Sequence, residues 1–284
     1  MNPSYRQIAE LFGFEVPGTK IEPTLAGKIT GETAEESAAL GGQSLSEGDY
    51  DKAIQHFRRA LEQGGEDAGR FLALGGAYES AEMAPQALQQ YLRALQAKNN
   101  APEPHLAISQ IYKREGRWKD SIDELERALK TDPNNAFFQM KLAELFRETG
   151  YREQALQAIQ AAVAENPTDS FYHFYMGEIL LELGSNKAAL DAYRAAVELS
   201  PGDDHLFLRA AIAFWRLGKP TEAIKSVRLA SDLDPEKSMY YGVLELLLRA
   251  DSKLEEAALE SKRASSMDRY DQDQLGRLSK EFGI

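Results

Sequence analysis

The chain has 284 residues, a formal net charge of −12 and no cysteine. The missing thiols exclude disulfides and thiolate metal sites, which favours a reducing compartment such as the cytoplasm. The negative charge disfavours binding to nucleic acid, whose phosphate backbone it would repel. No apolar run approaches the ~20 residues that span a bilayer, and residues 1–20 lack the pattern of a secretion signal, so we expect no membrane insertion.

Residues 1–33 form the first expected segment, an N-terminal arm that does not share the pattern of the residues after it. Asn2 and Pro3 can start a short helix that Gly13 ends, and an extended stretch rich in Gly, Pro and Thr follows. The apolar face of this helix consists of Tyr5, Ile8, Leu11 and Phe12. We expect the arm either to cover the open face of the next hairpin or to dock on a second protein or a second copy of this chain.

Residues 34–269 repeat with a period of 34 residues and without insertions. Small residues mark the period at Ala53, Ala87, Ser121, Ala155, Ala189, Ala223 and Ala257. The repeats start at residues 34, 68, 102, 136, 170, 204 and 238; small residues also recur at positions 8 and 27, and larger apolar residues at positions 11 and 24. This spacing predicts seven stacked helical hairpins, each in contact only with its neighbours.

Glycine at position 15 and proline at position 32 predict where the two helices of a repeat end. Glycine suits the left-handed conformation that follows a helix, and proline cannot continue one. Repeat two is an exception, because Glu82 stands where the glycine is expected.

The last repeat and the residues after it predict the end of the stack. In repeat seven, Glu245 and Ser261 replace residues on which a further hairpin would pack. Residues 270–284 follow, with Asp271 as a helix N-cap and an apolar face made of Leu275, Leu278 and Phe282. We predict a C-terminal capping helix over the exposed end of the stack.

This pattern resembles the tetratricopeptide repeat family, in which positions 8, 20 and 27 are small, positions 11 and 24 are large and apolar, and position 32 is proline. The resemblance covers residues 34–269. It implies an all-α, right-handed superhelical solenoid of antiparallel helix pairs. It also implies that partners bind to the concave face, which the first helix of each repeat lines with positions 2, 5, 9, 12 and 13.

The concave positions differ along the array. Repeats one and two carry mostly small groups, and repeat three carries Lys113 and Arg114, which can hold a carboxylate and set the polarity of a bound segment. Repeats four to seven predict an apolar groove lined by Phe137, Met140, Phe171, Phe174, Leu181, Leu208, Ile212, Trp215, Met239 and Leu246, with Glu144, Glu178 and Glu182 selecting positive charge.

Two interpretations of the apolar positions stay open. Neighbouring first helices can bury position 5 between repeats, which would make Met140, Phe174 and Leu208 core residues. Positions 9 and 12 face the groove more directly, so we predict that Ile212, Trp215 and Leu246 anchor a partner.

The groove favours an adaptor or scaffold that binds a peptide or helix of another protein, apolar or mixed apolar and basic. The alternatives are a structural subunit of a larger assembly, held by the arm or the convex face, and self-association through the arm. A clamp for the acidic tails of chaperones is not expected, because Ala38, Gly42, Leu72 and Gly76 stand where the family's clamp needs lysine and asparagine.

No residue pattern predicts catalysis, a cofactor or a metal site. His105 and His173 share position 4 but lie two repeats apart, too far to hold one metal ion. The glycine pairs at residues 41–42 and 75–76 lack the strand and the lysine of a phosphate-binding loop. We therefore expect a protein-binding module without enzymatic activity.

Overall fold

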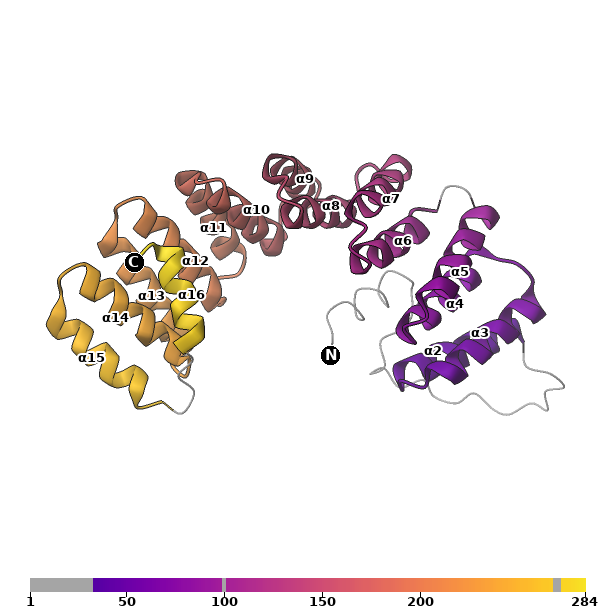
Figure 1. The fold of residues 1–284 in the computed structure, drawn as a ribbon, viewed down its shortest axis with the longest axis horizontal. Coiled ribbons are helices and arrows are strands. Elements are labelled where there is room, and N and C mark those ends of the chain that lie inside the picture. The colour runs from indigo at the N-terminus through magenta and orange to yellow at the C-terminus, as the bar shows by residue number, and fades with distance from the viewer. Residues whose placement is uncertain (1–32, 99–100, 268–271) are drawn as a thin grey trace. The chain divides into compact units, whose positions relative to one another are not determined.

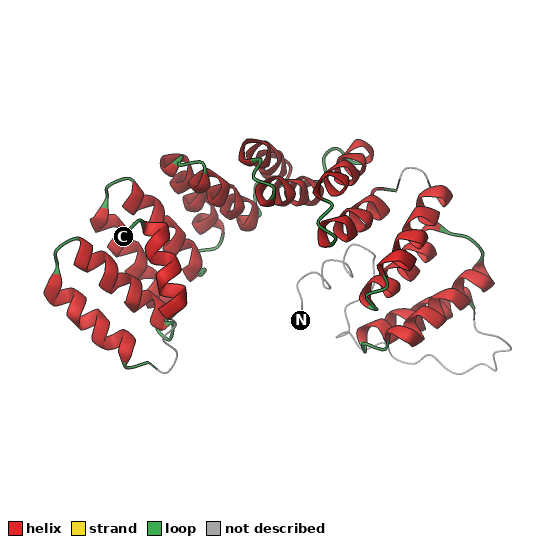
Figure 2. Cartoon of the chain, in the orientation of Figure 1, coloured by secondary structure: helices red, strands yellow, loops and turns green. Residues whose placement is uncertain are grey.

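The computed structural model describes residues 33–98, 101–267 and 272–284. These residues form fifteen helices and no strand. The ribbon views show the helices and the loops that connect them (Figure 1, Figure 2). The all-α prediction is therefore confirmed. The chain divides between Glu115 and Gly116 into two compact units. The predicted arm helix, with Tyr5, Ile8, Leu11 and Phe12, lies outside the described residues.

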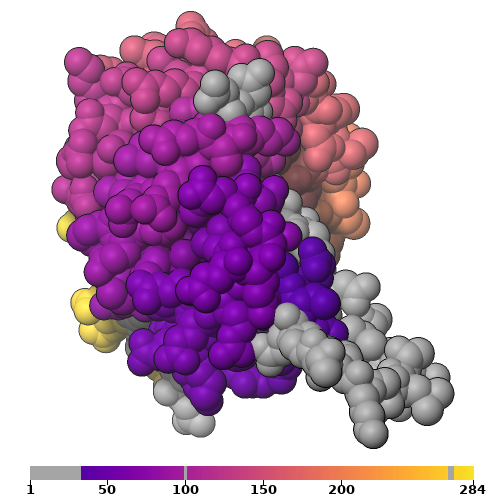
Figure 3. Space-filling view, turned by 90° about the vertical axis from the view of Figure 1, so that its right-hand side faces the viewer, coloured from indigo at the N-terminus to yellow at the C-terminus, as the bar shows by residue number. Residues whose placement is uncertain are grey.

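The first unit is a stack of helices in which each helix packs on the next one along the chain. Figure 3 looks onto the surface of this unit, coloured from indigo to purple. Its helices are α2 (Ala34–Ser46), α3 (Tyr50–Gly64), α4 (Ala68–Ser80), α5 (Ala84–Ala97) and α6 (Pro102–Arg114).

The second unit continues the same alternation of first and second helices. Its helices are α7 (Trp118–Thr131), α8 (Ala136–Glu148), α9 (Arg152–Glu165), α10 (Ser170–Glu182), α11 (Asn186–Leu199), α12 (Asp204–Arg216), α13 (Pro220–Leu233), α14 (Ser238–Ala250), α15 (Leu254–Ser265) and α16 (Gln272–Phe282). The helices α8, α10, α12 and α14 are the first helices of repeats four to seven.

Most first helices begin after a polar residue whose side chain accepts a hydrogen bond from the backbone of the first turn. Thr33 does so before α2, together with Glu36, whose carboxylate accepts a hydrogen bond from the Thr33 backbone N–H. The other N-caps of this kind are Asp67, Asn135, Asp169 and Asp203. These side chains satisfy N–H groups that have no partner within the helix, which fixes where each repeat starts.

The two helices of a repeat pack through positions 8 and 24, and the residues at these positions match in size. Where position 24 is aromatic, position 8 is glycine, and a Cβ on Gly177 would lie 2.5 Å from the Tyr193 ring. Where position 24 is Ile or Val, position 8 is alanine. Within the two units the pairs are Gly41 with Phe57, Gly75 with Tyr91, Ala143 with Ile159, Gly177 with Tyr193 and Ala211 with Val227. The volume at the contact is thus conserved from hairpin to hairpin.

The turn between the two helices of each repeat uses a left-handed residue at position 15. Five repeats place glycine there, with φ between 69° and 84°. Glu82 in repeat two and Ser252 in repeat seven adopt φ of 60° at the same position. The backbone of the turn is therefore the same with and without glycine, and the two non-glycine residues bear the strain of that conformation.

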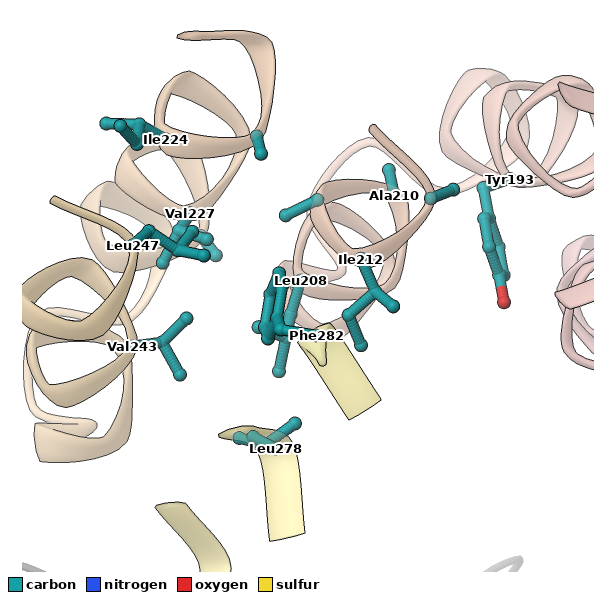
Figure 4. Close-up of a cluster of buried hydrophobic side chains, with 14 of the residues drawn as sticks. Tyr193, Leu208, Ala210, Ile212, Ile224, Val227, Val243, Leu247, Leu278 and Phe282 are labelled. Atoms are coloured by element: carbon teal, nitrogen blue, oxygen red, sulfur yellow. The ribbon is translucent and has the colours of Figure 1, made fainter. Parts of the chain in front are cut away.

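The C-terminal helix α16 packs mainly against α12 and α14, the first helices of repeats six and seven (Figure 1). We expected this segment to be a capping helix at the end of the stack, and it packs on α14 of the last repeat as well as on α12. Leu278 and Phe282 join the apolar cluster to which α12 and α14 contribute (Figure 4). Asp271, the expected N-cap, lies outside the described residues.

Candidate functional site

The surface that positions 2, 5, 9, 12 and 13 form on α8, α10, α12 and α14 is called the inner face below. The structure divides its predicted groove residues into buried and accessible ones. Four of them are less than 9% exposed: Met140, Leu181, Leu208 and Ile212. Ile212 is completely buried, so it does not lie on an open groove as the sequence suggested. The burial of Met140 and Leu208 agrees with the interpretation that position 5 is packed between neighbouring repeats.

One part of the inner face is covered by the chain itself. We call this covered surface the α16 groove; its inner-face residues are Leu208, Ile212, Trp215 and Arg216 of α12, and Arg209 at position 6 of the same helix adjoins them. In Figure 4, Phe282 lies beside Leu208 and Ile212, and Leu278 lies next to it between the two helices. The Phe282 ring meets the Trp215 ring edge-on, with 6.5 Å between the ring centroids. Trp215 is therefore packed on α16 and is only partly accessible.

The end of α16 is held by two arginines of α12. Arg216 donates hydrogen bonds from Nε and Nη2 to the Glu281 carbonyl oxygen, at 3.0 and 2.8 Å. Arg209 forms an ion pair with the Glu281 carboxylate. The carbonyl groups at the end of a helix have no partner in the helix and carry partial negative charge, so two cations suit this place. The α16 groove thus binds both the apolar face and the C-terminal end of a helix.

Another part of the inner face stays open. We call it the aromatic strip; its residues are the position-2 residues Phe137, Phe171, His205 and Met239, with Phe174 at position 5. Phe171 is 47% exposed and stacks on Tyr175, with 6.0 Å between the ring centroids. The Phe174 ring lies 6.2 Å from Phe171 and 5.5 Å from His205. The strip therefore contains a group of contacting rings, formed by Phe171, Phe174 and His205, with Phe171 accessible to solvent.

The strip leads into an open cleft on the same unit. This cleft has a volume of about 900 Å³, and its lining includes His205, Met239, Tyr240 and Met267. Lys237 lies at the same cleft, with its ammonium group 5.8 Å from the centre of the Tyr240 ring. Thioether and aromatic groups adapt to varied apolar side chains, so the cleft extends the apolar surface that the strip offers.

The predicted acidic residues are paired within the chain. Glu178, only 9% exposed, accepts hydrogen bonds from Arg209 Nε at 2.6 Å, from Arg209 Nη2 at 2.8 Å and from the Tyr193 hydroxyl at 2.6 Å. Burial and the Glu178 carboxylate raise the pKa of the Tyr193 hydroxyl. Although burial opposes the charge of Arg209, Glu178 raises the pKa of its guanidinium group. Glu178 therefore joins α10 to α12 and is not available to a partner's cation.

Two further carboxylates of the predicted set contact cations of neighbouring positions. Glu182 lies 2.6 Å from Arg147 Nη2, which links α10 to α8, and the Arg147 guanidinium lies 5.1 Å from the centre of the Tyr175 ring. Glu144 lies 2.9 Å from Lys141 Nζ. The Arg147–Glu182 pair joins two repeats, whereas the Lys141–Glu144 pair lies within α8. The sequence reasoning missed both pairs, although Arg147 lies about one repeat before Glu182 and Lys141 lies three residues before Glu144.

A polar cluster joins the start of α12 to α14. Asp204 accepts hydrogen bonds from Lys237 Nζ at 2.6 Å and from the Tyr240 hydroxyl. Partial burial opposes ionisation of Asp204, but these hydrogen bonds lower the pKa of its carboxyl group below the usual value. Burial and Asp204 raise the pKa of the Tyr240 hydroxyl. These contacts join the residues next to His205 and Met239, which line the cleft.

The remaining predicted residues lie elsewhere. Lys113 and Arg114 belong to α6 in the first unit, where Arg114 forms an ion pair with Glu79 of α4. Leu246 is half-buried on α14. Among the residues that the structure describes, no cluster of three or more His, Cys, Asp or Glu side chains is arranged for a metal ion. Within the same ranges, every helix is too short or too polar to cross a bilayer.

Comparison with known proteins identifies the family of the repeats. The family model of the tetratricopeptide repeat matches residues 45–102, 106–170 and 140–204, which together cover more than half of the chain. No curated protein sequence matches the chain.

Solved structures share the fold. YrrB, described as a tetratricopeptide repeat protein with an unusual peptide-binding site, matches 70% of this chain and 100% of its own, with 24% identity and a TM-score of 0.57. A tetratricopeptide repeat protein of Parabacteroides merdae matches 89% of this chain and 100% of its own, with 17% identity and a TM-score of 0.59. The C-terminal part of a Cytophaga hutchinsonii repeat protein matches 86% and 98%, with 12% identity and a TM-score of 0.70. With its repeats, helix pairs and family match, the chain belongs to the tetratricopeptide repeat family.

Proposed function

We propose that this protein is an adaptor or scaffold that binds an apolar segment, or a mixed apolar and basic segment, of a partner protein along the aromatic strip. Tetratricopeptide repeat proteins generally mediate protein–protein interactions, and their fold is typically a non-catalytic scaffold. The strip is the part of the predicted groove of repeats four to seven that α16 leaves uncovered. The proposed binding surface thus lies within the second unit.

The exposure of Phe171 is the observation that carries this proposal. Nearly half of this large ring is open to solvent, although Phe174 and Tyr175 beside it are ordered by ring contacts. Exposed clusters of rigid aromatic groups on a soluble protein usually mark an interaction site, because a partner gains apolar burial there at a small entropic cost. The net charge of −12 favours a partner segment that also carries basic residues.

We further propose that the protein works in the cytoplasm and without catalysis. The absence of cysteine fits a reducing compartment. YrrB, which shares the fold, is described as having a peptide-binding site, and a peptide is a natural ligand for a strip of this kind.

The test compares the variant with Phe171→Ala and Phe174→Ala against wild type in partner capture from a native lysate, followed by mass spectrometry. Affinity for the captured partner should fall by about tenfold or more, as for other interface hot spots. The matched control is Leu229→Ala on α13, which removes a side chain 50% exposed on a second helix. Equal recovery with the double variant would reject the strip and direct the search to the N-terminal arm and the second helices.

A further inference from the structure

We propose that the α16 groove is a second protein-binding site, which accepts the C-terminal end of an amphipathic helix from a partner and which α16 occupies in the partner's absence. The groove and the aromatic strip adjoin, since Gln274 of α16 lines the cleft beside His205 and Met239. This inference rests on the groove residues and not on Phe171, which carries the proposed function of the strip. The bound α16 shows directly which ligand chemistry the groove selects.

The helix α16 lies on a surface where a partner is expected to bind. Trp215 and Leu246 occupy positions 12 and 9, and the sequence predicts these as anchors for a partner of another chain. In the structure, Trp215 instead receives the Phe282 ring of α16. A segment of the same chain therefore lies where a partner is expected, and it makes the kind of contact that a partner would make.

The groove recognises three features of α16. Leu278 and Phe282 fill the apolar cluster and are 6% and 3% exposed. The Glu281 carboxylate pairs with Arg209, and the Glu281 carbonyl oxygen accepts two hydrogen bonds from Arg216. A matching partner helix has an apolar residue, an acidic residue three positions later and an aromatic residue next, close to the helix end. Because Arg216 bonds a backbone carbonyl oxygen that only a helix end leaves unpaired, it selects that end.

The composition of α16 makes it an exchangeable occupant. It has 11 residues, of which only Leu278 and Phe282 are buried. Gly276 lies inside it with no atom near its missing side chain, so this glycine lowers helix propensity and no close contact requires it. An attached helix competes at an effective concentration in the millimolar range. A partner helix with more apolar contacts can therefore replace it.

The experiment uses the full-length chain and a fluorescent peptide with the sequence of residues 272–284. Wild type should bind the peptide weakly because α16 fills the groove. The variant with Leu278→Ala and Phe282→Ala in the chain should bind it about tenfold more tightly or better, since its own helix no longer competes. Circular dichroism confirms that the repeats stay folded. Glu281→Gln is a milder second variant, which retains both buried side chains and should bind the peptide about twofold to threefold more tightly than wild type does.

Controls separate specific binding from adhesion. A peptide with alanine in place of its phenylalanine should lose most of the affinity, and Arg216→Gln added to the double variant should weaken binding. Phe171→Ala should leave peptide binding unchanged, because that residue lies on the strip. Equal binding by wild type and the double variant, or equal binding of the alanine peptide, would overturn the proposal. The molecular mass in solution is a further control. If the mass of wild type doubles as its concentration rises, and the mass of the double variant does not, the groove binds a second copy of the chain and the proposal is overturned.

Discussion

The aromatic strip and the α16 groove lie on the same unit of the molecule and carry similar apolar residues, but they meet different surroundings. Phe171 of the strip is 47% exposed, whereas Ile212 of the groove is completely buried. Both lie at positions that line the partner-binding face in the family. The helix α16 packs on α12 and α14 and joins the apolar cluster that contains Ile212, whereas the Phe171 ring contacts Phe174 and Tyr175 of its own helix.

A position within the repeat defines the direction of a side chain but not its accessibility to solvent. Positions 9 and 12 point away from the hairpin interior, so a later segment of the chain can cover them as well as a partner can. Phe171 of the strip is accessible because no described segment packs over its ring. The contacts with Phe174 and Tyr175 hold this ring in position. Four predictions test this division, in order of decreasing effect.

The first prediction compares truncation of a covered residue with truncation of an open one. Ile212→Ala should lower the free energy of unfolding by about 3 kcal/mol, because it leaves a cavity in the cluster under α16. Phe171→Ala should change it by less than about 0.5 kcal/mol, because the ring is half exposed. Chemical denaturation followed by circular dichroism measures both. Similar losses for the two variants would break the comparison.

The second prediction concerns the support beneath the strip. Gly177→Ala should lower the free energy of unfolding by about 2 kcal/mol, because the added Cβ displaces the buried Tyr193 ring, which contacts Phe174. Adding Tyr193→Ile should recover part of the loss, since repeat four combines Ala143 with Ile159. A double-mutant cycle measures the coupling, expected to exceed about 1 kcal/mol. Additive losses would mean that the two positions do not share a contact.

The third prediction isolates backbone strain from side-chain burial. Ser252→Gly, in the turn between α14 and α15, should raise the free energy of unfolding by about 0.5 to 1 kcal/mol, because Ser252 has φ of 60°. Thermal denaturation measures the gain. Ser185→Gly, at a residue with a negative φ of −79°, is the control and should not stabilise. A loss of stability in Ser252→Gly would contradict the assignment of strain to this turn.

The fourth prediction uses pH on the polar cluster at the cleft. The pKa of Asp204 is lower in the folded protein than its usual value, so its contribution is present at neutral pH and is lost as the pH falls through the folded-state pKa. Asp204→Asn should cost about 0.5 kcal/mol at neutral pH, and its difference from wild type should shrink below about pH 4. Unfolding at several pH values measures this. Asp191→Asn, which removes an exposed carboxylate, is the control. A difference that grows on acidification would have the wrong sign.

The sequence predicted the all-α repeat fold because the period of 34 residues determines both helix pairing and hairpin packing. Gly177 and Tyr193 illustrate this, since their sizes alone indicate a close contact between two helices. The sequence also singled out Leu278 and Phe282 as one face of a final helix. It could not show that this face packs on α12 and α14, because apolar spacing defines a face and does not specify its partner.

The electrostatics of the site were also beyond the sequence reasoning. Glu178 seemed suited to a partner's cation at its concave position, yet Arg209, 31 residues later, pairs with it. Such a pair forms only where side chains of neighbouring repeats come within ion-pair distance, and the 34-residue period alone does not predict which ones do. The same holds for the apolar cluster around Ile212, which Leu278 and Phe282 join from outside the repeats.

Fluorescence of Trp215 tests the covered groove most directly. The chain has two tryptophans, and Trp118→Phe leaves Trp215 as the single reporter beside Phe282. In that background, Phe282→Ala should shift the emission to longer wavelength and increase quenching by acrylamide, because α16 no longer shields the indole ring. Phe171→Ala should change neither. If Phe282→Ala also leaves emission and quenching unchanged, α16 does not cover the groove in solution, and the division of the inner face into a covered and an open part is contradicted.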